Sequence, residues 1–107
     1  MDVFDLLDQI KQRPGMYVGS SDSQRGEQLR NLELLLHGYS MALGCHQIRE
    51  PVSDFPREFS HYLRGRFGWS TACGPAAAVR DASDTDDEAW EMFWRLVAEF
   101  RASLSRG

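Results

Sequence analysis

The chain has 107 residues, of which 42% are hydrophobic and 11% aromatic, so residues 1–107 can form one domain with a modest core. Its 16 acidic residues outnumber its 12 basic ones, and the net charge of −4 makes it a poor general binder of nucleic acid. No window is apolar enough to span a membrane, and acids stand where a signal peptide carries bases, so we expect a cytoplasmic protein.

The N-terminal half predicts two helices. Apolar residues at helical spacing begin after Asp2, a candidate cap, and this first helix must end at Arg13–Pro14 because proline disfavours the α conformation before it. The second helix covers about 27–43 and is apolar enough to run through the core, with Gly44 as its stop. Residues 46–55 contain a proline and are predicted to be a linker.

The C-terminal half predicts up to three more helices. One covers about 56–67, and a short one contains 76–79, with Ser70 or Thr71 as its cap. The last begins within the acidic run 83–88, where the helix dipole favours negative charge, and continues with aromatic residues at three- and four-residue steps. No alternating strand pattern occurs, so we predict an all-α domain of four or five packed helices.

The run from Arg13 to Gly19 reads Arg-Pro-Gly-Met-Tyr-Val-Gly and favours a tight corner after the first helix. Its proline-glycine pair suits a type II turn with positive φ at Gly15. Met16, Tyr17 and Val18 would then pack back on the core, and the chain would continue from Gly19 into a polar loop. We interpret these residues as a structural corner: Arg13, Pro14, Gly15, Met16, Tyr17 and Gly19.

The same run resembles a motif near the N-terminus of the ATPase domain in type II topoisomerase B subunits. That resemblance implies a catalytic glutamate on the next helix and a magnesium-binding asparagine one turn later. Glu33 aligns with the glutamate, but His37 stands in place of the asparagine, and a neutral imidazole is a poor ligand for Mg²⁺. Nothing after residue 50 resembles the family's nucleotide motifs, so we expect no cofactor and keep a degenerate nucleotide-binding domain as a third hypothesis.

Cysteines and histidines form no catalytic or metal pattern. Cys45 and Cys73 are predicted to be two buried thiols, with a disulfide between them as the alternative. A zinc site from these cysteines with His46 and His61 lacks the usual ligand spacing, and nothing selects a Cys–His nucleophilic pair. We therefore expect a protein that is not an enzyme and holds no metal.

Aromatic and charged residues provide the candidate partner surface. The main packing aromatics are predicted to be Tyr39, Trp69, Trp90 and Trp94. Tryptophan near the surface and arginine are typical interface anchors, so Trp69, Arg64 and Arg66 are candidates. The alternative for Arg57, Arg64 and Arg66 is a solvated helix face. An acidic patch for a basic partner is predicted at Asp84, Asp86, Asp87 and Glu88.

The layout of the chain resembles a group of small bacterial immunity-like proteins that carry the same Arg-Pro-Gly-Met-Tyr motif. It has a short helix before the motif, a Leu-rich helix with Gly38-Tyr39, a tryptophan at 69 and an aromatic last helix with an acidic start. The resemblance implies a protein that neutralises a cognate toxin by direct contact and needs no chemistry of its own. The acidic charge of the chain would favour a basic toxin. The alternative is a small regulator or adaptor, homodimeric through its aromatic C-terminal helix.

Overall fold

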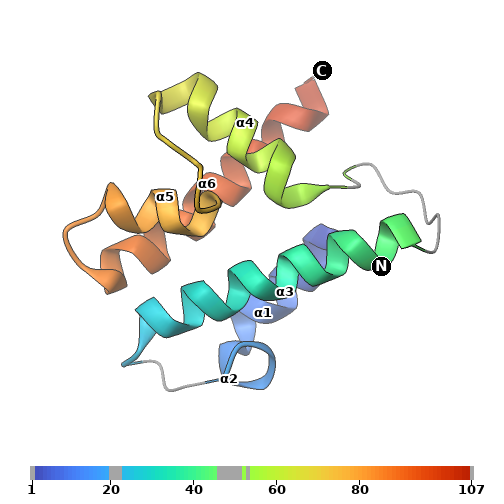
Figure 1. The fold of residues 1–107 in the computed structure, drawn as a ribbon. Helices are drawn as coiled ribbons and strands as arrows, with labels where there is room; N and C mark the ends of the chain where they lie inside the picture. Colours follow the sequence, from blue (N-terminus) through green and yellow to red (C-terminus); the bar gives the residue numbers. More distant parts are fainter. Residues whose placement is uncertain (1, 20–22, 46–51, 53, 107) are drawn as a thin grey trace.

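The computed structural model describes residues 2–19, 23–45, 52 and 54–106, and these ranges contain helices but no strand (Figure 1). The helices are α1 Val3–Gln12, α2 Pro14–Tyr17, α3 Arg25–Cys45, α4 Phe55–Phe67, α5 Pro75–Asp81 and α6 Asp86–Arg106. The all-α prediction is confirmed. The expected number of four or five helices is wrong, because the described residues form six, and the additional helix is the short α2 after the first helix.

Helix α3 is the central element of the fold. It packs on α4, α5 and α6, and Figure 1 shows α1 behind it and α4 crossing α6. The molecule measures 36 × 31 × 23 Å along its principal axes. The predicted linker lies mostly outside the described residues, and every described helix is too short or too polar to cross a membrane.

Aromatic rings from three helices form the centre of the core. Phe4 of α1 meets Phe55 of α4 edge to face at 6.0 Å, and Phe59 meets Phe93 and Phe100 of α6 at 5.8 and 5.4 Å. Aromatic pairs in these geometries add to the free energy gained by burying their surface. The predicted packing aromatics are confirmed: Trp90 and Trp94 are buried, and Tyr39 and Trp69 pack partly buried against the cluster.

The corner after α1 differs from the predicted turn. Residues Pro14–Tyr17 form one turn of helix with proline at its first position, and Gly15 does not have a positive φ. The positive φ of 65° falls instead on Gly19, where the chain leaves the corner. Val18 is buried as predicted, but Met16 is 71% exposed and Tyr17 37% exposed, so these two side chains do not pack into the core.

Side chains of α3 fix this corner by binding its backbone. Asn31 Nδ2 donates to the carbonyl of Val18 at 2.8 Å, and Gln28 Nε2 donates to the carbonyl of Gly19 at 3.2 Å. Gln28 is fully buried and accepts in turn from the guanidinium of Arg25 at 2.7 Å. A buried amide needs such partners, and here they determine where the chain turns.

Three local predictions are wrong. Gly44 does not stop α3, which continues to Cys45. Neither Ser70 nor Thr71 caps the short fourth helix, because α5 begins at Pro75 with Gly74 in the capping position. Both cysteines are free and exposed rather than buried or paired, since Cys45 ends α3 and Cys73 lies in the segment before α5.

Candidate functional site

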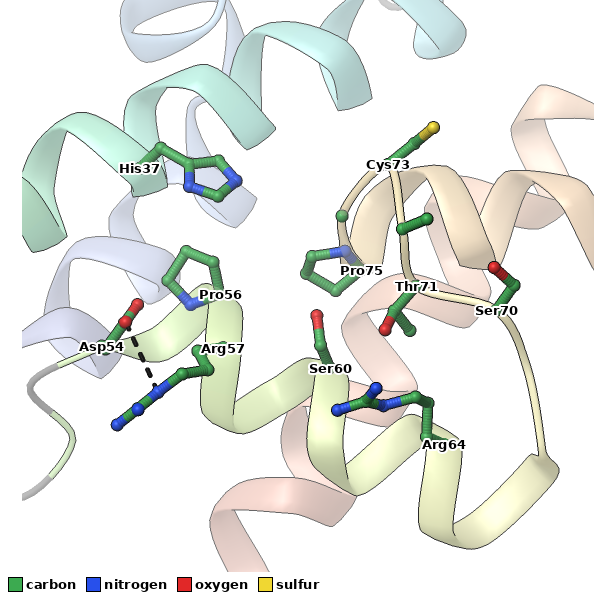
Figure 2. Close-up of a pocket in the computed structure, with 12 residues that line it drawn as sticks. His37, Asp54, Pro56, Arg57, Ser60, Arg64, Ser70, Thr71, Cys73 and Pro75 are labelled. Carbon is green, nitrogen blue, oxygen red and sulfur yellow. Dashed lines mark ion pairs between the residues drawn. The ribbon is translucent and has the colours of Figure 1, made fainter.

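A groove of about 680 Å³ lies between α3, α4 and the segment that leads into α5 (Figure 2). We call it the basic groove, because two guanidinium groups and an imidazole line it against one carboxylate. Its lining residues are His37, Asp54, Pro56, Arg57, Ser60, Arg64, Ser70, Thr71, Ala72, Cys73, Gly74 and Pro75.

Two features of the sequence place these side chains together. On α4, Arg57, Ser60 and Arg64 follow one another at three- and four-residue steps, which puts them on one side of the helix. The helix then ends at Gly68, whose φ of 73° is the left-handed conformation common after a helix C-terminus. The chain turns back there and brings Thr71 onto the groove opposite α4.

The two arginines of the groove are in different states. Arg57 Nε lies 3.6 Å from a carboxylate oxygen of Asp54, and Figure 2 shows this guanidinium turned toward that pair. Arg64 turns instead toward the side lined by Ser60 and Thr71, and one of its amino groups lies 3.5 Å from Nδ1 of His61. Asp54 therefore offsets Arg57, while the charge of Arg64 has no carboxylate partner among the described residues.

Beneath the groove, Glu33 of α3 holds the start of α5. Its Oε1 accepts from the backbone N–H of Ala76 at 2.9 Å, and its Oε2 lies 3.5 Å from Nε2 of His37. Burial raises the pKa of the Glu33 carboxyl, although the Ala76 hydrogen bond and His37 act in the opposite direction. Glu33 and His37 do lie together as their spacing predicts, and the carboxylate serves as a cap supplied by another helix.

Gly74 is required by this arrangement. Its φ is 101°, and a Cβ on it would collide with the carboxylate of Glu33. Both observations exclude an ordinary side chain at this position. The glycine therefore allows the segment before α5 to approach α3 closely.

The predicted acidic patch lies elsewhere, at the junction of α5 and α6. We call it the acidic corner, and it consists of the exposed residues Asp81, Asp84, Asp86, Asp87, Glu88 and Glu91. Within it, Arg80 Nε pairs with Asp86 at 3.3 Å, and the hydroxyl of Thr85 accepts from the N–H of Glu88 at 3.1 Å to cap α6. Residues 80–95 contain six carboxylates and two arginines, a net charge of −4 that equals that of the whole chain.

Of the other predicted partner residues, Arg64 lines the basic groove, and Arg66 and Trp69 lie outside both the groove and the acidic corner. Arg66 pairs with Glu99 at 3.4 Å, and its guanidinium lies 5.1 Å from the ring centre of Phe67. Trp69 is half-buried and stacks on Phe67 with ring centres 4.3 Å apart. The structure thus separates the predicted set into the acidic corner, the basic groove and this aromatic pair.

Sequence reasoning missed the groove itself. Ser60 and Arg64 are a helical i, i+4 pair, which the sequence shows, but the approach of Thr71 depends on where the chain turns after α4. Among the described residues no cluster of three or more cysteine, histidine or carboxylate side chains could hold a metal. His46 of the weighed zinc set lies outside them.

Comparison with known proteins gave no match: neither a protein-family model, nor a curated protein, nor a solved structure resembles the chain at a significant level.

Proposed function

We propose that the protein is a non-enzymatic binding protein of the immunity type, which neutralises a basic protein toxin by direct contact. The observation that carries the proposal is the segregation of charge. Residues 80–95, which contain the acidic corner, hold the whole net charge of the chain, and the remaining residues carry ten acids and ten bases. Such a localised field attracts and orients a partner of opposite charge.

The acidic corner is also built so that its charges can remain exposed. Asp86, Asp87 and Glu88 occupy the first turn of α6, where the helix dipole stabilises negative charge. The corner is anchored from below, because Trp90 of α6 and Val79 of α5 are buried in the core. A partner would therefore meet a preformed acidic surface and would not have to order it.

The test is affinity capture from a native lysate with two charge variants as baits. The variant D84N/D87N removes two charges of the acidic corner. The control E27Q/E58Q removes two charges from the first turns of α3 and α4. We expect a basic protein to be retained by the native chain and the control and lost, or bound at least about tenfold more slowly, with D84N/D87N.

The retained protein must then be shown to be a toxin. We expect it to arrest growth when expressed alone and to be harmless when the native chain is co-expressed. A partner bound equally by D84N/D87N, or one whose expression does no harm, would contradict the proposal.

The second candidate, a homodimeric regulator, is favoured by exposed apolar residues on α3 and not by the last helix. The aromatic face of α6 is buried within the chain and is not available for a dimer. On α3, however, Leu34 is 67% exposed and Met41 70% exposed, and Gly38 lies between them with no contact around its Cβ position. Sedimentation of the native chain and of Met41→Glu tests this candidate, which requires a dimer that the substitution dissociates.

A further inference from the structure

The polar groups of the basic groove fall into two sets, those already engaged within the chain and those directed to the groove. Arg57 is offset by Asp54, and the N-terminus of α5 is occupied by the carboxylate of Glu33. Among the remaining donors are the guanidinium of Arg64, of which one amino group lies near His61, and the hydroxyls of Ser60 and Thr71, which donate to no acceptor among the described residues.

These three donors come from two sides of the groove. Ser60 and Arg64 belong to α4, and Thr71 belongs to the segment facing it. A guanidinium presents several N–H groups in a plane, and each hydroxyl adds a donor with a rotatable hydrogen. A tetrahedral oxyanion can use donors from several directions, whereas a planar carboxylate offers two oxygens in one plane.

The size and walls of the groove indicate a ligand larger than the anion alone. Its volume of about 680 Å³ lies within the range of small-molecule sites. The rings of Pro56 and Pro75 form an apolar wall beside the polar end, and the imidazole of His37 lies beyond them in Figure 2. Such a wall can hold the uncharged part of a small molecule while the polar end fixes its orientation.

We propose that the basic groove binds a phosphoryl group, as free phosphate or as the monoester of a small molecule, through Arg64, Ser60 and Thr71. This site is separate from the acidic corner and does not depend on the toxin-binding proposal. The phosphoryl oxygens accept hydrogen bonds from the guanidinium and the two hydroxyls. No bond is made or broken in this binding.

The experiment is a calorimetric titration of the whole chain with inorganic phosphate and, separately, with glycerol 3-phosphate. The variant Arg64→Gln removes the guanidinium, and Arg66→Gln is the matched control, because it removes the same charge from α4 outside the groove. We expect Arg64→Gln to weaken binding at least about tenfold and Arg66→Gln to leave it within about twofold. Thr71→Val provides a second test with no change in charge, and it should also weaken binding.

Each outcome bears on the proposal. Equal affinity for the two probes identifies free phosphate as the ligand, and tighter binding of glycerol 3-phosphate identifies a monoester. The proposal is overturned if neither probe binds at millimolar concentration, or if Arg64→Gln and Arg66→Gln weaken binding equally. It is also overturned if Thr71→Val, folded by its circular dichroism, binds as the native chain does.

Discussion

The corner at residues 13–19 and the segment at 68–75 both turn the chain, but they differ in what becomes of their polar groups. In the corner, carbonyl oxygens of Val18 and Gly19 accept hydrogen bonds from side chains of α3. In the other segment, the hydroxyl of Thr71 faces a groove. The distinctive motif at residues 13–19 thus has its carbonyl oxygens bound within the fold, whereas the segment at 68–75 directs a hydroxyl donor to the groove. The phosphoryl site that we propose therefore rests on hydrogen-bonding groups that the chain leaves unused, and not on a distinctive string of residues.

The largest expected effect concerns the close approach of 68–75 to α3. Gly74→Ala should lower the free energy of unfolding by about 2–3 kcal/mol, because the new Cβ is strained at a φ of 101° and meets the Glu33 carboxylate. Urea denaturation of both proteins measures it.

Gly68→Ala is the control for backbone strain alone. Its φ is 73°, and its Cβ position is open. The loss should be about 1 kcal/mol. Equal losses for the two variants would show that the contact with Glu33 contributes nothing.

The second effect concerns the binding of the corner by α3. Asn31→Ala removes the donor to the carbonyl of Val18 and should lower the free energy of unfolding by about 1–2 kcal/mol. Tyr17→Phe removes a hydrogen bond to Gln9 on the exposed side of the corner and should change stability by less than about 0.5 kcal/mol. Chemical denaturation measures both losses. If Tyr17→Phe lost more stability than Asn31→Ala, the exposed tyrosine and not Asn31 would stabilise the corner.

The third effect is a dependence on pH. Because the folded pKa of Glu33 is raised, folding favours its protonated form, and its contribution to stability is fully present only below the ordinary value of 4.5. The free energy of unfolding should therefore fall as pH rises from 4.5 through the raised pKa.

Glu33→Gln should remove that part of the slope, and Glu27→Gln, an exposed glutamate of the same helix, should retain it. Denaturation at a series of pH values measures the slopes. The same slope in Glu33→Gln as in the native chain would assign the pH dependence to another group.

The smallest effect distinguishes the observed corner from the predicted turn. Gly15 lies in a helical turn with open space around its Cβ position, so Gly15→Ala should leave stability unchanged or raise it by about 0.5 kcal/mol. A type II turn with positive φ at this glycine would instead make the alanine destabilising. The sign of the change in melting temperature decides between the two.

The sequence predicted those parts of the fold that depend on local patterns. Apolar spacing and caps predicted α1, α3, α4 and α6, and the acidic residues before Trp90 correctly marked the start of the last helix. The acidic corner was also predictable, because its residues are neighbours in the chain. These features need no knowledge of how distant segments meet.

The predictions that were wrong, and the groove that was missed, depend on contacts between segments distant in sequence. The start of α5 is capped by Glu33, which lies 43 residues before Ala76, so no capping residue near 70 was needed. The position of the positive φ at Gly19 follows from hydrogen bonds made by α3. The groove requires Thr71 to return to α4, and a helix pattern cannot show that.

We expect the cap that Glu33 provides to couple the unfolding of α3 and α5. α5 has seven residues and no side-chain cap of its own at its first turn, and a helix so short does not persist alone in water. Its backbone amides can therefore be protected from hydrogen exchange only while α3 is in place. Opening of α3 should expose the amides of both helices at the same free-energy cost, so one exchange rate constant would describe segments far apart in sequence.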